Sequence, residues 1–180
     1  MHKNYPSAKI RKTAEARTPV LQTSVAFCLR KLLAELREDH REQFAAKGVR
    51  LEFGCPRGRL WVEGRRFDVK VALRHLLANA LRHTPRNGCV ALVAGVRDKG
   101  GVEVKVLDNG PGFPPLPWYK SLTAFPNQLS AYLSHFTERR GLYSAFLLLS
   151  ANQVKLELNS KPGLGTRLRF VLRRTPRLEN

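Results

Sequence analysis

The residues with the clearest chemical potential lie in the sequence Asp108-Asn109-Gly110-Pro111-Gly112, which follows a strand-like run. A carboxylate at the end of a strand is a strong hydrogen-bond acceptor. The glycines after it leave the backbone open to close approach by a planar ligand. A second polar side chain, Asn79, falls inside an otherwise apolar helical pattern. The stretch of residues 73–113 therefore carries the candidate functional groups.

A helix and two strands must position these groups. Residues 69–84 have one apolar face at helical spacing, which predicts an amphipathic helix that carries Asn79. A proline and an Asn-Gly pair directly after it end this helix. Residues 89–96 and 101–107 predict two strands, and the second alternates valines with polar residues before it reaches Asp108. The apolar face of the predicted helix consists of Val69, Leu73, Leu76, Leu77 and Ala80.

Three motifs resemble a known superfamily. Residues 76–85 read Leu-Leu-Ala-Asn-Ala-Leu-Arg-His-Thr-Pro, residues 108–112 read Asp-Asn-Gly-Pro-Gly, and residues 160–170 read Ser-Lys-Pro-Gly-Leu-Gly-Thr-Arg-Leu-Arg-Phe. In this order they resemble the N box, the first glycine box and the closing strand pair of the GHKL (Bergerat-fold) ATPases, which include gyrase, the heat-shock chaperone, histidine kinases and MutL-type repair proteins. The most similar branch is the catalytic ATP-binding domain of sensor histidine kinases. The resemblance covers about residues 20–173.

The resemblance implies a role for each matching residue, with ATP and Mg²⁺ as cofactors. Asp108 matches the aspartate that accepts a hydrogen bond from the adenine amino group. Gly110 and Gly112 match glycines that leave room for the base and sugar. Asn79 matches the asparagine whose side-chain oxygen binds Mg²⁺, and a hard cation that keeps several waters needs only one or two such protein ligands. Thr166 matches a threonine near the adenine and its bridging water.

The chain departs from the histidine-kinase pattern one helical turn before Asn79. That branch usually has asparagine there, and other branches use glutamate to orient water, but this chain has His75. A histidine at this place is either a base near neutral pH or a passive helix residue. We favour the passive interpretation, and we expect weak intrinsic ATP hydrolysis. The phospho-acceptor histidine has no equivalent, because Ala14 stands at the only superficially similar place.

The second glycine box is the other departure. The kinase pattern of three glycines that hold the phosphates corresponds here to residues 137–142, where only Gly141 remains. Arg139, Arg140 and Lys120 could replace the missing amide donors with charge-assisted hydrogen bonds to phosphate. Equally, these bulky residues could block the approach of the loop to the phosphates. Adenine recognition is therefore expected to be intact, whereas triphosphate binding stays open.

The remaining patterns predict one α+β domain, a two-layer α/β sandwich of the Bergerat type with a mixed sheet and helices on one face. Helices are expected at residues 22–47 and 141–152, and Asp68 is expected to be an N-cap or first-turn acid of the helix that carries Asn79. Further strands are expected at residues 49–53, 59–62, 154–159 and 165–172, and the first two are expected to form a hairpin.

The domain boundaries follow from composition and from the resemblance. Residues 1–17 are basic and lack periodicity, which indicates a loose arm or linker remnant. Residues 18–174 form the ATPase-like domain, in which residues 113–140 correspond to the ATP lid. Residues 175–180 are a short tail. Three widely spaced cysteines indicate small buried hydrophobes rather than a disulfide framework or a zinc site.

The formal charge of +18 favours anionic partners: nucleotide, an acidic protein surface or nucleic acid. The arginines are dispersed along the sequence and not interleaved with aromatic residues, which argues against a dedicated nucleic-acid surface. No apolar run is long enough for a membrane span, and the start has no signal segment. We therefore expect a cytoplasmic domain, or the cytoplasmic part of a membrane sensor, and we expect a monomer.

Two functional hypotheses follow. The first is the ATP-binding catalytic domain of a two-component sensor histidine kinase, which presents Mg-ATP to a histidine on a separate dimerisation domain, with a response regulator as the later partner. The alternative is a degenerate GHKL domain that no longer binds ATP well and acts as a protein-interaction or phosphotransfer scaffold. The reduced second glycine box favours the alternative, and the intact Asp108 motif favours the first.

Overall fold

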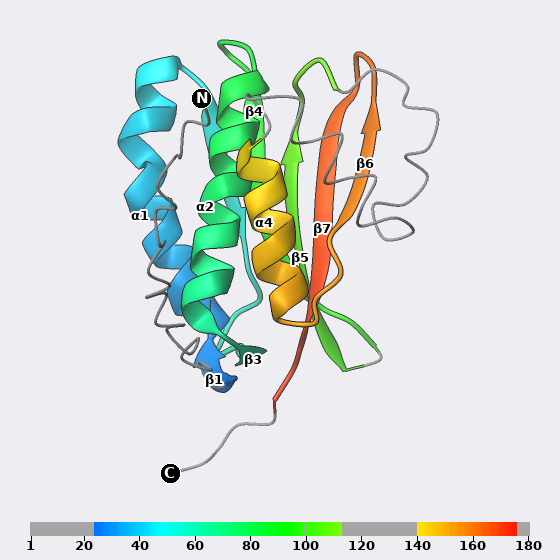
Figure 1. The fold of residues 1–180 in the computed structure, drawn as a ribbon. Helices are drawn as coiled ribbons and strands as arrows, with labels where there is room; N and C mark the ends of the chain where they lie inside the picture. The colour runs from blue at the N-terminus through cyan, green and yellow to red at the C-terminus, as the bar shows by residue number, and fades with distance from the viewer. Residues whose placement is uncertain (1–23, 99, 113–139, 176–180) are drawn as a thin grey trace, which may run out of the picture.

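The computed structural model describes residues 24–98, 100–112 and 140–175 of the chain (Figure 1). The helices are α1 (Leu29–Lys47), α2 (Arg66–His83) and α4 (Arg140–Ala151). The strands are β1 (Val25–Cys28), β2 (Arg50–Gly54), β3 (Trp61–Gly64), β4 (Cys89–Val96), β5 (Gly101–Asp108), β6 (Glu157–Lys161) and β7 (Gly165–Arg173). The predicted arm, residues 113–139 of the predicted lid and residues 176–180 of the tail lie outside the described residues.

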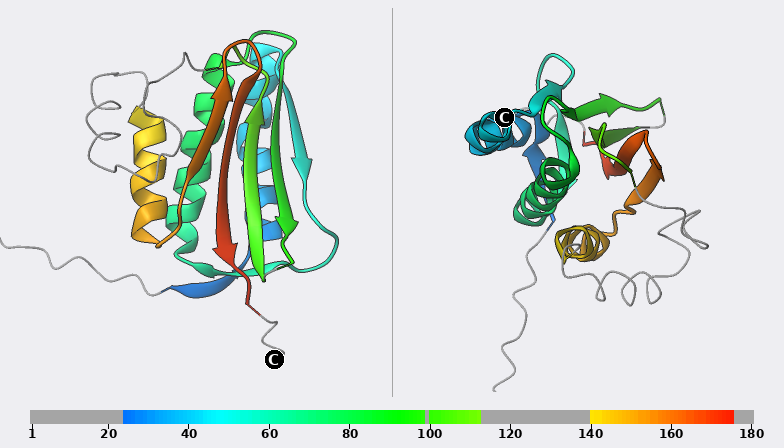
Figure 2. Two further views of the ribbon diagram at one scale, coloured as in Figure 1. Left: turned by 90° about the vertical axis from the view of Figure 1, so that its right-hand side faces the viewer. Right: turned by 90° about the horizontal axis from the view of Figure 1, so that it is seen from above.

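A five-stranded sheet is the main scaffold, with the strand order β2-β4-β5-β7-β6. β2 pairs with β4 in parallel, and the other neighbours are antiparallel, so the sheet is mixed. The three described helices pack on the same face of this sheet (Figure 2). A separate two-stranded sheet joins β1 to β3. The predicted two-layer α+β sandwich is therefore confirmed.

The core lies between the helices and the inward-facing positions of the strands. In β5, Val102, Val104 and Val106 are buried and alternate with half-buried residues, as the period of a strand requires. In α2 the entire predicted apolar face is buried. Each fully buried leucine contributes roughly 1.5–3 kcal/mol of hydrophobic stabilisation. The same burial fixes which side of α2 and which side of β5 face each other.

The predicted hairpin between residues 49–53 and 59–62 is wrong. β2 pairs with β4, whereas β3 pairs with β1. The turn-like residues between β2 and β3 separate the two strands but do not determine which strands pair. The predicted first helix also begins too early, because Val25–Cys28 form β1 and the helix starts at Leu29. The strand expected at residues 154–159 lies later, at Glu157–Lys161.

A polar network fixes the start of α2 against the end of α4. The Asn152 side chain accepts a hydrogen bond from the backbone N–H of Arg65 at 2.7 Å. It donates to Asp68 Oδ2 at 3.0 Å and to the Leu148 carbonyl at 2.8 Å. Arg65 also pairs with Asp68 at 2.8 Å, so the predicted first-turn acid of α2 is buried with two partners. Asn152 therefore links two helices that lie far apart in sequence.

Replacement of Asn152 should destabilise the folded protein. Asn152→Ala leaves the Arg65 N–H without its acceptor and removes a donor from buried Asp68, so we expect a loss of about 2–3 kcal/mol in the free energy of unfolding. Denaturant unfolding followed by circular dichroism measures the change. Ser150→Ala, at an exposed position near the end of α4, is the control and should change stability by less than about 0.5 kcal/mol. Equal effects of the two variants would contradict the importance of this network.

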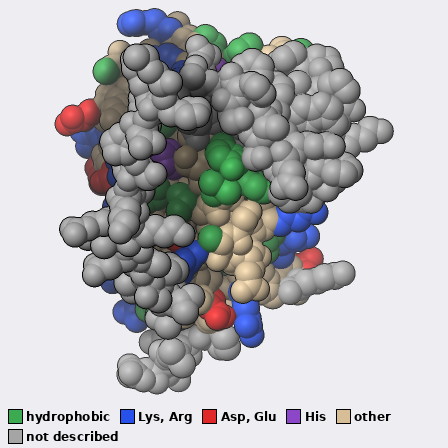
Figure 3. All heavy atoms as spheres, viewed as in Figure 1, with side chains coloured by type: hydrophobic (Ala, Val, Ile, Leu, Met, Phe, Trp, Pro, Cys, Tyr) green, Lys and Arg blue, Asp and Glu red, His purple; other side chains and the backbone are tan. Residues whose placement is uncertain are grey.

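The helical side of the domain exposes hydrophobic side chains. In the view of Figure 3, hydrophobic side chains gather at the centre of the helical side, over α4. This helix includes Leu147, whose side chain is half-exposed.

None of the helices in the described part of the chain is long and apolar enough to cross a membrane. Of the three cysteines, Cys28 is buried as predicted, and Cys55 and Cys89 are half-buried.

Candidate functional site

Asp108 ends β5 and is held in a fixed orientation by backbone donors. Its Oδ1 accepts hydrogen bonds from the N–H of Gly110 at 3.0 Å and from the N–H of Thr166 at 3.2 Å. Thr166 is also the residue opposite Asp108 in the β5–β7 ladder. The other carboxylate oxygen, Oδ2, accepts no hydrogen bond from any described residue. The geometry therefore leaves one oriented acceptor for a ligand.

The environment of Asp108 changes its acidity. Burial raises the pKa of this carboxyl above its ordinary value, while the hydrogen bonds from Gly110 and Thr166 and the charge of His83 oppose the rise. Loss of water makes an ionised carboxylate unfavourable unless donors surround it. A ligand that donates a hydrogen bond to Oδ2 would restore part of the stabilisation of the ionised carboxylate that is lost with its hydration. The site is therefore better suited to a donor group than to a second acceptor.

Two glycines bring the loop after β5 against the turn between β6 and β7. Gly112 has a φ of +71°, and a Cβ at this residue would lie 2.2 Å from the Lys161 carbonyl oxygen. Gly165 has a φ of +86°, and a Cβ there would lie 1.9 Å from the Asp108 carbonyl oxygen. Both residues need the left-handed conformation and the missing side chain. They fix the position of Asp108 relative to Thr166.

Thr166 and Gly110 complete the surroundings of Asp108. Thr166 is buried, and its hydroxyl lies 3.1 Å from the hydroxyl of Ser160. Ser160 in turn donates to the Gly165 carbonyl at 2.9 Å. Gly110 is also buried, and a Cβ there would lie 3.0 Å from the His83 carbonyl oxygen. This close approach joins the loop after β5 to the C-terminal end of α2.

One face of α2 connects this acceptor to α4. His75, Asn79 and His83 are spaced four residues apart, so they lie along the same side of the helix. At one end of this face His83 is next to Gly110, and at the other end Gly141 of α4 lies against His75, with a Cβ position 3.6 Å from His75 Nδ1. The helices α2 and α4 pack side by side. Asn79, which is 8% exposed, therefore lies between the Asp108 site and the start of α4.

The cation part of the site is compatible with Asn79 as the single protein ligand. Among the described residues there is no group of three or more His, Cys, Asp or Glu side chains that could hold a metal ion. Mg²⁺ does not need such a group, since phosphate oxygens and waters complete its octahedral coordination. The side-chain amide oxygen of an asparagine fits this donor set. The structure therefore allows the predicted magnesium role of Asn79.

The predicted phosphate-binding residues are only partly described. Lys120 and Arg139 lie outside the described residues, and Arg140 begins α4 with a side chain that is not described. Gly141 is in the first turn of α4. Sequence reasoning did not identify two residues that shape the site, His83 and Gly165. The close glycine spacing in residues 163–165 is a signal for Gly165, whereas nothing in the sequence indicated that His83 lies beside Asp108.

The fold and site together define a class of protein: an α+β sandwich with an oriented carboxylate at the end of a central strand and an asparagine on the helix in front of it. Residues 64–176 match the family model described as "Histidine kinase-, DNA gyrase B-, and HSP90-like ATPase". The chain belongs to this family. Its relatives are of the histidine kinase type, as the sequence motifs predicted.

Individual matches include a sensory kinase and the catalytic domain of a histidine kinase. The chain is 25% identical to the adaptive-response sensory kinase SasA of Synechocystis over 143 residues, which cover 78% of the chain and 37% of SasA. It is 33% identical over 137 residues to the non-motile and phage-resistance protein of Caulobacter vibrioides, covering 73% of the chain and 16% of that protein. The catalytic domain of the histidine kinase ThkA superposes with a TM-score of 0.67 at 22% identity, covering 85% of the chain and 97% of ThkA's domain. The chain thus spans well under half of the curated relatives.

Proposed function

We propose that this domain binds Mg-ATP and presents its γ-phosphate to a histidine on a dimerisation domain, either in a longer parent chain or on another polypeptide. The orientation of Asp108 is the observation that carries the proposal. Two backbone N–H groups occupy Oδ1, which leaves Oδ2 as the oxygen that would accept a hydrogen bond from the exocyclic amine of adenine. The roles of the individual site residues below belong to the same proposal.

Base selectivity follows from the chemistry of Asp108. Adenine places an amine donor where guanine has a carbonyl oxygen at the same ring position. A carbonyl oxygen facing a carboxylate would leave both acceptors without a donor, in a place where burial already disfavours the charge. Thr166 lies directly beside this carboxylate and is suited to hold a bridging water. The site therefore distinguishes adenine from guanine by the cost of an unmatched acceptor.

The phosphate end would lie along α2 toward α4. Asn79 supplies one oxygen ligand for Mg²⁺, and the metal neutralises phosphate charge when it is bound. The N-terminal end of α4, with Gly141 in its first turn, faces the same region, and its backbone N–H groups favour anions. Arg139, Arg140 and Lys120 would add charge there. In phosphoryl transfer the protein chiefly positions groups and stabilises charge, which is the task that these residues would perform.

Structural relatives support the choice of partners. ShkA, which superposes with a TM-score of 0.66 at 18% identity, was solved in complex with AMPPNP. ThkA was solved in complex with the response regulator protein TrrA. We extend adenine nucleotide and a response regulator to this chain as proposed partners, with a monomeric domain in the cytoplasm. We also propose residues 18–174 as the functional unit.

The magnesium role of Asn79 can be tested separately from adenine binding. For Asn79→Ala we expect the affinity for a non-hydrolysable ATP analogue in the presence of Mg²⁺ to fall by about tenfold to a hundredfold, because a ligand to the metal is lost. Affinity for ADP without Mg²⁺ should change by less than about threefold. Calorimetric titration with and without Mg²⁺ measures both. Arg74→Ala, an exposed neighbour on α2, serves as the matched control and should behave as the parent protein.

The outcomes of this titration separate the two functional hypotheses. An Asn79→Ala variant that keeps the full effect of Mg²⁺ would refute the proposed cation site. A parent protein that binds ADP but gains nothing from a third phosphate and Mg²⁺ would indicate that the reduced second glycine box no longer holds the triphosphate. That result would exclude the phosphate-presenting part of the proposal.

A further inference from the structure

The face of the sheet that points away from the helices carries a group of cationic side chains. In β7 the inward positions Thr166, Leu168 and Phe170 are buried, so Arg167 and Arg169 lie on the outward face. Arg167 is exposed and Arg169 is half-buried. None of the described helices packs on this face (Figure 2). These cationic side chains of β7 therefore lie on the face of the sheet that the described helices leave uncovered.

Strand register arranges these side chains in rows. Lys105 of β5 lies directly opposite Arg169 of β7, and Glu157 of β6 lies opposite Arg169 on the other side. In the next row Asn159 lies opposite Arg167. Like charges directly opposite each other on a sheet destabilise it. The row of Lys105 and Arg169 is therefore unfavourable unless carboxylates or an anionic ligand compensate for it.

Two carboxylates compensate for part of this charge. Arg169 donates from Nε to Glu157 at 2.5 Å and from Nη1 to Glu103 at 3.2 Å, and Lys105 pairs with Glu103. The hydrogen bond from Lys105 and the charge of Arg169 hold the pKa of Glu103 below its ordinary value. Arg167 and the neighbouring Lys155 form no ion pair with any described residue. Two cations on this face are thus left without a counter-charge in the described part of the chain.

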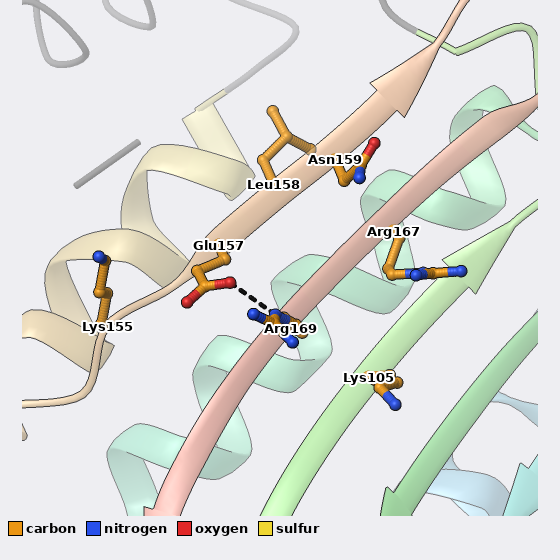
Figure 4. Close-up of a pocket in the computed structure, with 7 residues that line it drawn as sticks. All are labelled: Lys105, Lys155, Glu157, Leu158, Asn159, Arg167 and Arg169. Atoms are coloured by element: carbon orange, nitrogen blue, oxygen red, sulfur yellow. Dashed lines mark hydrogen bonds and ion pairs between the residues drawn. The ribbon is translucent and has the colours of Figure 1, made fainter. Parts of the chain in front are cut away.

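The surface around these residues is hollowed. A depression of about 510 Å³ is lined by Lys105, Lys155, Glu157, Leu158, Asn159, Arg167 and Arg169 (Figure 4). A second depression of about 380 Å³ shares Asn159 and Arg167 with it and adds Lys161 and Leu164. The two depressions form one elongated basic trough along β6 and β7. At its far end the trough meets Asp108 and Thr166, the residues of the candidate nucleotide site.

We propose that the basic trough binds an extended acidic segment of a protein partner. Its elongated shape fits a stretch of chain better than a single small anion. Arg167 and Lys155, which have no ion pair in the described part of the chain, and Lys161 further along provide cations at successive places for carboxylates. Leu164, which is 75% exposed in the turn between β6 and β7, offers an apolar contact beside Lys161. The proposal does not require nucleotide binding, because the cations that carry it are not among the residues that recognise adenine.

The lining favours a peptide over nucleic acid. Single-stranded nucleic acid is bound by cations together with aromatic side chains on which bases stack. The described residues that line the trough include no aromatic side chain. A phosphate backbone has no hydrogen-bond donor for Glu157, whereas a peptide can direct its own N–H groups to Glu157 and Asn159. The trough therefore has the mixed donors and acceptors of a protein-binding surface.

The test uses the full chain and a short fluorescein-labelled peptide rich in glutamate, followed by fluorescence anisotropy at about 0.15 M salt. We expect the double variant Arg167→Glu, Lys155→Glu to bind this peptide at least about tenfold more weakly than the parent protein. The matched control is Lys31→Glu, Arg41→Glu, which makes the same change in net charge at exposed positions of α1 in the other layer. It should weaken binding by less than about threefold.

Three other results would contradict the proposal that the trough binds an acidic peptide. Equal losses in the two double variants, or no binding of the peptide by the parent protein, would overturn the proposal. Tighter binding of a single-stranded oligonucleotide than of the peptide, lost in the trough variant, would replace it with a nucleic-acid site. Titration with ADP separates this test from the nucleotide proposal: the trough variant should keep its ADP affinity, and Asn79→Ala, at a residue that does not line the trough, should keep peptide binding.

Discussion

Asp108→Asn should lower the affinity for ADP and for an ATP analogue by about a hundredfold or more. The N–H groups of Gly110 and Thr166 would keep the amide oxygen of the new side chain at the place of Oδ1. The amide NH₂ would then point to the adenine amine, so that two donors face each other. Loss of a charge-assisted hydrogen bond together with an unpaired buried donor costs about 3 kcal/mol or more. Calorimetric titration of the folded variant measures the loss.

The stability of this variant separates a binding defect from a folding defect. Burial raises the pKa of Asp108, so the folded parent protein binds this proton more tightly than the unfolded chain does. The parent protein therefore loses stability relative to Asp108→Asn as pH rises from the ordinary carboxyl pKa of about 4 through the raised value. At pH 7 the variant should be at least as stable as the parent, and this advantage should disappear near pH 3.

Thermal unfolding at the two pH values checks this expectation. Asp98→Asn, at an exposed acid in the turn between β4 and β5, makes the same charge change and should alter neither nucleotide affinity nor the pH dependence. A parent protein that is stabilised by ionisation of Asp108 at neutral pH would contradict the assigned cause of its pKa shift. Nucleotide binding that survives in Asp108→Asn would show that adenine is recognised elsewhere.

Gly165→Ala should cause the largest loss of stability of any single methyl addition in this region. The new Cβ would lie 1.9 Å from the Asp108 carbonyl oxygen, and the φ of +86° is unfavourable for alanine. Backbone atoms on both sides have to move, so the β5–β7 ladder must shift at Asp108 and Thr166. We expect a loss of about 3–5 kcal/mol, which lowers the melting temperature by roughly 10 °C.

Gly163, two residues earlier in the same turn, provides a matched control. Its φ of +76° is similar, but a Cβ there meets no atom within 4 Å. Gly163→Ala should therefore cost only the left-handed conformation, about 1–2 kcal/mol. The difference between the two variants isolates the contact with Asp108 from the backbone preference. Equal losses in thermal unfolding would show that this contact can relax freely and does not hold Asp108 in place.

The elements with long periodic patterns could be predicted from the sequence. The buried face of α2 and the buried valines of β5 are those that the spacing indicated. The four apolar residues of β1 could not be assigned, because a run this short fits the start of a helix as well as a strand. The pairing of β2 with β4 and of β3 with β1 could not be predicted from the sequence either. Pairing depends on contacts between distant segments, which turn residues do not encode.

For the site, the sequence identified residue types but not their arrangement. Asp108 and Thr166 were selected through separate motifs, and the structure places them opposite each other in one ladder. The proximity of His83 to Gly110 arises from the way α2 packs on the sheet, which no local pattern reveals. The same holds for the charged side chains: Lys105 and Arg169 are far apart in the sequence, and strand register places them opposite each other.

The most direct test of the central claim is calorimetric titration of the domain with ADP, with a non-hydrolysable ATP analogue in Mg²⁺, and with the corresponding guanine nucleotides. We predict roughly micromolar binding of the adenine nucleotides, about −8 kcal/mol, and guanine nucleotides that bind at least about a hundredfold more weakly. Binding should require Asp108. Absence of heat with every nucleotide, from protein shown to be folded, would contradict the account and leave the domain as a protein-interaction module.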